Sequence, residues 1–285
     1  STHRFPMAKF RLLHQLLLEQ GVIQEAWVHR PVSIARNDLE QIHPRTYHEA
    51  FSRDQLTPAE QRRIGLPATR PLIRRTWLAV GGTLLTARLA LRHGVACHLA
   101  GGTHHAHPTF GSGFCIFNDC AVAARVLLNE GKVRRILLID LDVHQGDGTA
   151  ACFRDDPRVT TLSVHAASNF PLRKVEGDID IPLDDGTGDD DYLTAIADRL
   201  PNTLDQQKPD LVLFNAGVDP HRDDRLGRLS LSDTGLMLRD RLVLDACLRR
   251  RVPIASVIGG GYDAFTPLVQ RHAIVVRAAA EQARL

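Results

Sequence analysis

The chain has 285 residues, of which 44% are hydrophobic, 24% charged and 5% aromatic, an ordinary composition for a globular protein with room for one large α/β domain or two smaller ones. The formal net charge of +2 gives no strong electrostatic attraction to nucleic acid or to a membrane surface, so neither is expected as a partner. No stretch approaches the roughly 18 uninterrupted apolar residues of a membrane span, so no transmembrane helix is expected.

Short apolar runs alternate with helical patterns along the chain. In chain order, the patterns predict a helix at 6–20, a strand at 22–29, helices at 45–52 and 74–93, a strand at 95–100, a helix at 117–130, strands at 135–141 and 159–164, a helix at 190–207, a strand at 210–216, a helix at 233–250, a strand at 253–258 and a helix at 264–284. Helices between fully apolar strands indicate a parallel sheet covered on both faces. Because no linker or internal repeat divides the chain, a single domain over residues 1–285 is expected.

Polar residues collect where four of the predicted strands end. "VACHLAGGTHHAH" runs into a histidine pair, "ILLIDLDVHQGDG" into three aspartates and a histidine, "LVLFNAGVDPH" into an aspartate, and "PIASVIGGGYD" into three glycines and a tyrosine. In open parallel sheets, ligands bind beyond the carboxyl ends of the strands. The four sets of residues are therefore expected to meet at one edge of the sheet.

One of these sets has the pattern of a metal site. Side chains two residues apart on an extended segment point to the same side, so Asp142 and His144 can point together, with Asp140 behind them. Asp219, from a distant strand, would complete a three-ligand set with an open fourth position, which is typical of a catalytic zinc site. A divalent ion in such a site lowers the pKa of water to about 7 and polarises carbonyl groups.

The tandem histidines His104 and His105 bring two imidazoles to one place. Asp140 and Asp147 are the carboxylates not used as ligands, so they can orient the two rings. Tyr262, on a glycine-rich turn, can donate a hydrogen bond to a developing oxyanion. Each feature alone is more often a helix cap, a surface pair or a simple turn, but their combination at one sheet edge favours a metal-dependent hydrolase.

As a set, "GGTHHA", "DLDVHQGDG", "NAGVD" and "GGGY" resemble the histone deacetylase superfamily over nearly the whole chain. "HRFPMAKFRLL" and "NAGVDPHRDDRLGRLSLS" are most similar to class IV of that superfamily. The resemblance implies an arginase/deacetylase α/β fold, with an eight-stranded, mostly parallel sheet and helices on both faces. It also implies removal of acyl groups, acetyl or long-chain fatty acyl, from lysine side chains of proteins or peptides.

The resemblance also implies roles for individual residues. The ligands of zinc, or alternatively of ferrous iron, would be Asp142, His144 and Asp219, and the catalytic residues would be His104, His105, Asp140, Asp147 and Tyr262. Within this set, His105 would be the general base and then the general acid, while His104 would act mainly through its charge. The walls of the substrate tunnel would be Gly113, Phe114, Phe170 and Leu226. A structural potassium ion beside the zinc would be held by Asp140, Asp142, His144, Ser163 and Val164.

The chain departs from the family pattern in two places that bear on the substrate. The rim aspartate that grips the substrate backbone in class I enzymes has no clear match in the segment 54–76. Where polyamine-specific members carry an acidic residue at the pocket mouth, this chain has the neutral Leu226, which argues against a cationic polyamine. The further aspartate of the two-metal arginases is missing after both His144 and Asp219, which disfavours an arginase.

Two other functions stay open at this point. The first is a hydrolase of small N-acyl amides, such as an acetylpolyamine-like or acetoin-pathway enzyme. The second is an acyl-lysine binding module without activity, although none of the essential residues is missing.

The five cysteines are odd in number and show no CxxC spacing, so reduced thiols in a cytoplasmic protein are expected. The first residues, "STHRFPMAKFRLL", have no uninterrupted apolar core and do not resemble a signal peptide. The remaining histidines, including His107, are assigned no catalytic role.

Overall fold

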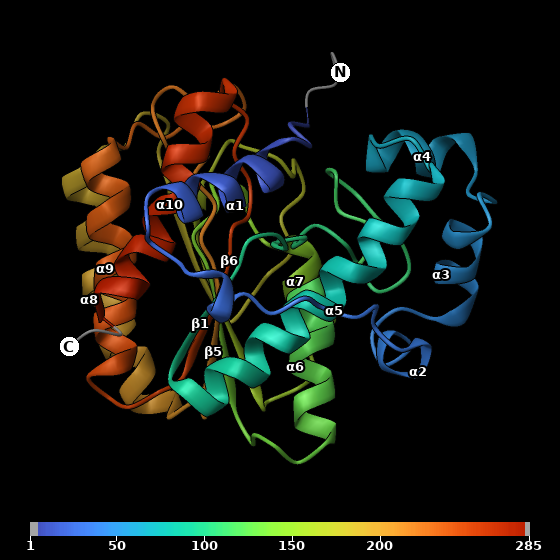
Figure 1. Cartoon of the computed structure of the whole chain (residues 1–285), viewed down its shortest axis with the longest axis horizontal. Helices are drawn as coiled ribbons and strands as arrows, with labels where there is room; N and C mark the ends of the chain where they lie inside the picture. The colour runs from blue at the N-terminus through green and yellow to red at the C-terminus, as the bar shows by residue number, and fades with distance from the viewer. Residues whose placement is uncertain (1–4, 283–285) are drawn as a thin grey trace.

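Six parallel strands form the central sheet in the computed structural model, which describes residues 5–282 (Figure 1). In order across the sheet, they are β1 (Val95–His98), β6 (Ile254–Val257), β5 (Leu211–Asn215), β2 (Ile136–Asp140), β3 (Val159–Ala166) and β4 (Ile179–Leu183). Each pair of neighbouring strands is parallel, so all the carboxyl ends lie at the same edge. The predicted α/β fold with a parallel sheet is confirmed.

Alternation of side chains along the strands builds a core on each face of the sheet. In β2, Leu137 and Ile139 pack on one side, and Ile136 and Leu138 pack on the other. The first face is covered by α1 (Lys9–Glu19), α8 (Asp189–Gln207), α9 (Asp233–Leu248) and α10 (Phe265–Gln282). The second is covered by α5 (Arg70–His93), α6 (Asp119–Asn129) and α7 (Asp147–Phe153), with α2 (Arg36–Leu39), α3 (Arg45–Ser52) and α4 (Pro58–Ile64) outside them (Figure 1).

The strand prediction fails at two places. Residues 22–29 contain the 3-10 helix η1 (Glu25–Trp27) instead of a strand, and Trp27 is 55% exposed, so the apolar residues there do not share a buried face. The pattern misses β4 because the apolar residues of this short strand, IDIPL, alternate with Asp180 and Pro182. A proline is tolerated there because β4 lies at the edge of the sheet. The sheet of the described residues has six strands rather than the eight that the resemblance implies, and β1 pairs only with β6.

Two helices that the hydrophobic periodicity does not predict begin at local sequence signals. In α4, the Thr57 side chain accepts a hydrogen bond from the Glu60 N–H while the Glu60 carboxylate accepts one from Thr57 N–H, a capping box with Pro58 at the first helical position. In α7, the helix begins at Asp147 within the motif that also carries the polar residues after β2. Short helices of this kind bury too few residues to show a period in the sequence.

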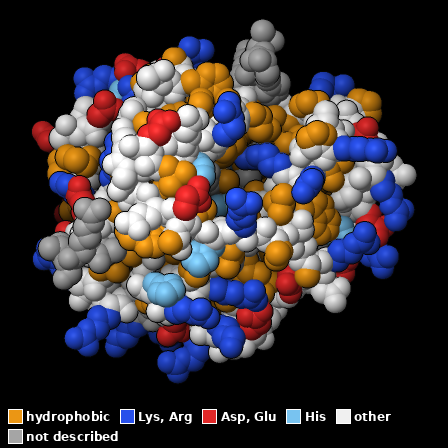
Figure 2. Space-filling view, in the orientation of Figure 1, with side chains coloured by type: hydrophobic (Ala, Val, Ile, Leu, Met, Phe, Trp, Pro, Cys, Tyr) orange, Lys and Arg blue, Asp and Glu red, His pale blue; other side chains and the backbone are white. Residues whose placement is uncertain are grey.

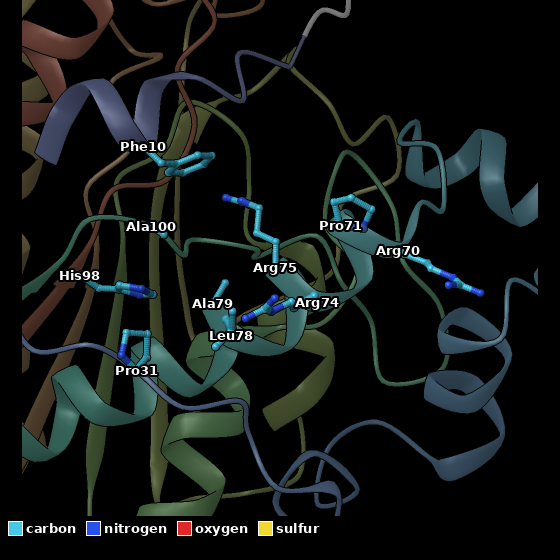
Figure 3. A pocket seen from close by; sticks show the side chains of 10 residues that line it. All are labelled: Phe10, Pro31, Arg70, Pro71, Arg74, Arg75, Leu78, Ala79, His98 and Ala100. Atoms are coloured by element: carbon cyan, nitrogen blue, oxygen red, sulfur yellow. The ribbon is translucent and has the colours of Figure 1, made fainter. Parts of the chain in front are cut away.

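Two surface cavities formed by the described residues lie apart from the predicted site residues. One, of about 580 Å³, is lined by Arg70, Arg74 and Arg75 of α5 together with Phe10, over whose ring the Arg75 guanidinium lies at 4.0 Å (Figure 3). The other, of about 820 Å³, runs along the open edge of β1. Basic side chains are spread around the visible face of the molecule (Figure 2). None of the helices within residues 5–282 is both long and apolar enough to cross a membrane.

Candidate active site

The loops that follow four strands bring the predicted site residues together. β2 leads into Asp142 and His144, β5 into Asp219, β1 into the histidine pair, and β6 into Tyr262. These strands are consecutive in the sheet, in the order β1, β6, β5, β2, and all run in the same direction. The four loops therefore lie side by side at the carboxyl edge, where open parallel sheets place their ligands.

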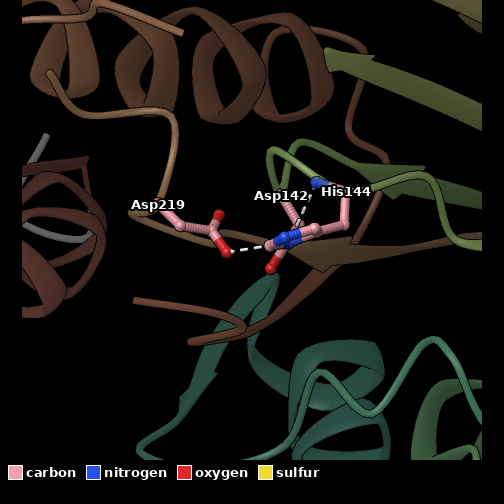
Figure 4. A group of neighbouring side chains, drawn as sticks. All are labelled: Asp142, His144 and Asp219. Carbon is pink, nitrogen blue, oxygen red and sulfur yellow. Dashed lines mark hydrogen bonds and ion pairs between the residues drawn. The ribbon is translucent and has the colours of Figure 1, made fainter. Parts of the chain in front are cut away.

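Asp142, His144 and Asp219 form a buried cluster (Figure 4). His144 Nδ1 lies 2.9 Å from Asp142 Oδ1 and 3.2 Å from Asp219 Oδ2, and one potential ligand atom from each residue lies within 4.8 Å of the others. The outer oxygens are held by the backbone: Asp142 Oδ2 accepts from Gly260 N–H at 2.7 Å, and Asp219 Oδ1 accepts from Val143 N–H at 2.9 Å. The two carboxylates are thus fixed in direction by the backbone.

The electrostatics of this cluster suit a cation. Burial raises the pKa of Asp219 to about 7, and the neighbouring Asp142 carboxylate adds to the effect. Burial would lower the pKa of His144, but its contacts with Asp142 and Asp219 outweigh burial and raise that pKa to about 10. Asp219 Oδ2 is buried without a hydrogen bond, and His144 Nδ1 lies 3.2 Å from it. Two carboxylates, one of which has an oxygen without a hydrogen bond, and an imidazole form a donor set that fits a zinc ion.

Close approach of the β6 loop keeps the two carboxylates together. A Cβ atom on Gly260 would lie 2.1 Å from Asp219 Oδ2 and 2.5 Å from Asp142 Oδ2. Real Cβ contacts are essentially never this short, so any larger residue at Gly260 would displace both carboxylates. The second glycine of the GGGY sequence is therefore required by the geometry of the cluster.

Replacing Gly260 with alanine should lower the affinity for zinc at least about tenfold, because the added methyl group pushes both carboxylates out of position. The measurement is zinc titration of metal-free protein by calorimetry. The matched control is Gly188→Ala, since a Cβ at Gly188 meets no atom within 4 Å. Equal zinc affinities for the two variants would mean that the carboxylates do not form the binding site.

A buried arginine ties together the two loops that carry the cluster. Arg239 of α9 is fully buried and donates through Nη1 to Leu141 O at 3.2 Å and to Gly217 O at 2.6 Å. Its charge is balanced by Asp240, whose Oδ1 accepts from Arg239 Nε at 2.8 Å. Because Leu141 precedes Asp142 and Gly217 lies two residues before Asp219, this contact fixes the distance between the segments that supply the two carboxylates.

The tandem histidines each bond a separate carboxylate. His104 Nδ1 lies 2.6 Å from Asp140 Oδ2, and His105 Nδ1 lies 2.6 Å from Asp147 Oδ1. The two rings are 4.0 Å apart, and His104 Nε2 is 3.7 Å from Asp142 Oδ1, so the pair adjoins the metal-site cluster. An ionised carboxylate accepts hydrogen bonds only, so each ring carries its proton on Nδ1 and can present Nε2 to the site.

The two rings have opposite protonation tendencies. Burial, together with the charge of the adjacent His104, lowers the pKa of His105 to about 4. Burial also acts on His104, but Asp140 and Asp142 outweigh it and raise the pKa of His104 to about 9. These opposite shifts favour a neutral His105 beside a positively charged His104. Such a split in pKa between neighbouring groups is typical of acid–base sites.

Tyr262 lies beside the cluster that His144 belongs to. Its ring centroid is 6.3 Å from that of His144, and its backbone N–H donates to Asp224 Oδ2 at 2.7 Å. Burial raises the pKa of the Tyr262 phenol well above its usual value, and the carboxylates of Asp219 and Asp142 add to this. The phenol therefore keeps its proton and can act as a hydrogen-bond donor.

The residues predicted for the substrate tunnel lie beside these groups. Phe170 meets the His105 ring edge-on at 4.8 Å, and the Phe114 ring is 5.9 Å from that of Tyr262. A Cβ atom on Gly113 would come within 2.7 Å of the His105 ring, so this position admits only glycine without a shift. The carbonyl of Leu226 accepts a hydrogen bond from the side chain of Asn169, the neighbour of Phe170.

The residues predicted to hold potassium lie at the end of β2, in the loop that follows it and in the neighbouring strand β3. Asp140 of β2 is opposite Ser163 of β3, and Val164 follows in the same strand. Ser163 Oγ lies 3.0 Å from Nδ1 of His165. Asp142 and His144 follow Asp140, so the five residues occupy adjoining backbone on the side of the metal cluster that faces β3.

Four residues of the site were not predicted from the sequence. Lys9 is fully buried and donates through Nζ to Gly259 O at 3.1 Å, and burial lowers its pKa to about 8. Asn215 Nδ2 donates to Asp140 Oδ1 at 2.9 Å, and His107 Nε2 lies 2.9 Å from Asp147 Oδ2. With Arg239, these are single polar residues in otherwise ordinary helices, strands or loops. Lys9 in "HRFPMAKF", His107 at the end of "VACHLAGGTHHAH" and Asn215 in "NAGVD" lie within stretches that the sequence singled out, whereas Arg239 does not.

Several known proteins are similar to this chain over most of its length. A family model described as the histone deacetylase domain matches residues 3–279. An uncharacterized protein of Picosynechococcus sp. (strain ATCC 27264 / PCC 7002 / PR-6) is 55% identical over 97% of this chain and 93% of its own length. Histone deacetylase 2 of Arabidopsis thaliana is 29% identical over 91% of this chain and 70% of its own length. The acetoin utilization protein AcuC of Staphylococcus aureus is 32% identical over 80% of this chain, which spans only 64% of that protein.

Two crystal structures have the same architecture. The HD domain of HDA15 superposes with a TM-score of 0.82 at 22% identity, covering 98% of this chain and 82% of that one. A histone deacetylase homologue in complex with SAHA also superposes with a TM-score of 0.82, at 27% identity, covering 95% of this chain and 76% of the other.

Proposed function

This chain belongs to the histone deacetylase family, and on that premise we propose that it is a zinc-dependent hydrolase that removes acyl groups from lysine side chains of proteins or peptides. The observation that carries the proposal is the buried cluster of Asp142, His144 and Asp219 beside two histidine–aspartate pairs. We further propose that residues 1–285 act as one catalytic domain of class IV type in the cytoplasm. The five free cysteines support that location.

Asp142, His144 and Asp219 would hold the zinc ion, with ferrous iron as the alternative. When bound, such an ion makes water a stronger nucleophile at neutral pH and polarises the acyl carbonyl group. The unsatisfied Oδ2 of Asp219 and the two buried carboxylates support this role. We also propose a structural potassium ion at the adjoining residues Asp140, Asp142, His144, Ser163 and Val164.

His105 would transfer the protons of the reaction. Its Nδ1 side is held by Asp147, and its low pKa leaves Nε2 free to accept a proton from the attacking water. The same ring would then return the proton to the leaving amine of lysine. His104, kept positively charged by Asp140, would stabilise the negative charge that develops on the substrate.

Tyr262 would donate a hydrogen bond to the oxyanion of the tetrahedral intermediate, because its phenol stays protonated in this buried position. Gly113, Phe114, Phe170 and Leu226 would form the narrow apolar tunnel for the lysine stem. The neutral Leu226 supports an acyl-lysine over a cationic polyamine as the substrate. Hydrolysis would release the free lysine amine and the acyl group as a carboxylate.

A series of acyl-lysine peptides, from acetyl to myristoyl, tests the proposal. Zinc-loaded protein should hydrolyse at least one of them with a kcat/KM at least about tenfold above that for the same acyl group on a free diamine, because the peptide backbone supplies binding energy that a small amine lacks. Chelation should abolish the activity and added zinc should restore it. Preference for the small amines would favour the alternative, a small-molecule N-acyl amide hydrolase. The 32% identity to an acetoin utilization protein supports this alternative. Absence of any turnover would favour an acyl-lysine binding module.

A further inference from the structure

Asp147 bonds two imidazole rings rather than one. Its Oδ1 lies 2.6 Å from Nδ1 of His105, and its Oδ2 lies 2.9 Å from Nε2 of His107. Burial alone would raise the pKa of Asp147, but the hydrogen bonds from the two rings lower that pKa well below its usual range. The carboxylate is therefore ionised and accepts a hydrogen bond on each oxygen, so His107 must carry its proton on Nε2.

His107 is fixed in place from its other side. Its backbone N–H donates to Phe110 O at 2.9 Å, which closes a short turn over residues 107–110. Its ring stacks on that of Phe110, with centroids 4.4 Å apart and planes 15° from parallel. The Arg63 guanidinium lies over the Phe110 ring at 4.7 Å. The His107 ring, which bonds Asp147 Oδ2, is thus held in place by its stack with Phe110 and Arg63.

The second hydrogen bond matters because a carboxylate with one partner can rotate about its Cβ–Cγ bond. The Asp147 side chain is only 6% exposed, so without His107 its Oδ2 would be buried with no donor within the described residues, and the carboxylate would reorient to find one. Any such rotation moves Oδ1 away from His105. The orientation and the tautomer of His105 therefore depend on His107.

We propose that His107 is a positioning residue, which locks the Asp147 carboxylate so that His105 keeps its proton on Nδ1 and its Nε2 free toward the site. This proposal rests on the proposed function, in which His105 is the general base. It goes beyond the two histidine–aspartate pairs by adding a third imidazole to one of them.

Two variants separate the hydrogen bond of His107 from its packing. His107→Phe keeps an aromatic ring to stack on Phe110 but removes the donor, and His107→Gln keeps an N–H donor at nearly the same reach but removes the ring. We expect His107→Phe to lower kcat at least about tenfold with KM changed less than twofold, and His107→Gln to retain kcat within about threefold. Phe110→Leu, which removes the stack alone, should behave like the glutamine variant.

The tautomer of His105 is read independently of turnover by ¹⁵N NMR of histidine-labelled protein. Wild-type and His107→Gln protein should show His105 with its proton on Nδ1, whereas His107→Phe should show a mixture of tautomers. A His107→Phe variant with the wild-type tautomer overturns the positioning role even if the protein proves inactive on every acyl-lysine peptide. If the wild type is active and both His107 variants keep its kcat, the proposal also fails, while the proposed function stands. Equal losses in both variants would indicate a purely structural role and overturn it as well.

Discussion

Replacing Asp219 with asparagine should abolish zinc binding and lower amide hydrolysis by at least about 10³-fold, while the metal-free protein stays folded. The asparagine side chain keeps an oxygen that can accept from Val143 N–H, so the backbone contact of Asp219 is preserved. What disappears is the negative charge at Oδ2, the oxygen without a hydrogen bond. The measurements are metal content after dialysis against zinc and hydrolysis of an acyl-lysine peptide.

The stability of the Asp219→Asn variant distinguishes a metal site from a structural ion pair. The folded-state pKa of Asp219 is raised to about 7, so this carboxyl contributes stability below its unfolded pKa and loses that contribution as the pH rises through 7. In metal-free protein at pH 8, the variant should therefore unfold at the same urea concentration as the wild type or at a higher one. Marked destabilisation would contradict the metal-site interpretation. Asp198→Asn, on the exposed side of α8, is the control for loss of one negative charge.

Replacing Tyr262 with phenylalanine should reduce kcat by about 10²–10³-fold and leave KM nearly unchanged, since the phenol is needed only where negative charge develops on the substrate. This corresponds to about 2.7–4 kcal/mol of transition-state stabilisation, the usual effect of losing one such donor. The phenylalanine ring can keep the contact with Phe114, whose centroid lies 5.9 Å away. Steady-state kinetics on the best acyl-lysine peptide measures both parameters.

The control for Tyr262→Phe is the zinc content of the variant, which should equal that of the wild type because the hydroxyl is not among the predicted ligands. Wild-type turnover in Tyr262→Phe would remove this residue from the mechanism. A variant that lost its zinc would point instead to a role in shaping the β6 loop, which is held to Asp224 through the backbone N–H of Tyr262.

The sheet and its carboxyl edge could be predicted from the sequence because two independent signals agree there. Buried parallel strands are continuously apolar, as in Ile136 to Ile139, and charged residues directly after such a run are costly unless they are paired or bind an ion. In the segment 22–29, Gln24 and Glu25 interrupt the apolar residues, so the run is not continuous, and the segment does not form a strand.

The residues that support the site could not be predicted in the same way. In the sequence, Arg239 and Asp240 are typical of the exposed charged side of a helix. Their role becomes visible only in the structure, where α9 packs against the loops after β2 and β5. His107 reaches Asp147 only because a turn at Phe110 folds it back, and neither residue carries a pattern for that turn. Such contacts depend on how distant segments are placed relative to one another. Arg239 is 22 residues from Gly217 and 98 from Leu141 in the sequence, and His107 is 40 residues from Asp147.

The contact of Arg239 with Leu141 and Gly217 has a consequence for the synthesis of the protein. The predicted zinc ligands all precede residue 220. Arg239, which bonds the loops that carry them, belongs to α9, and Gly260, which lies against both carboxylates, follows in the loop after β6. A nascent chain that has emerged only as far as Asp219 has every ligand but neither of these supports. We therefore expect ribosome-stalled chains to acquire tight zinc retention only once residues up to about 262 have left the exit tunnel.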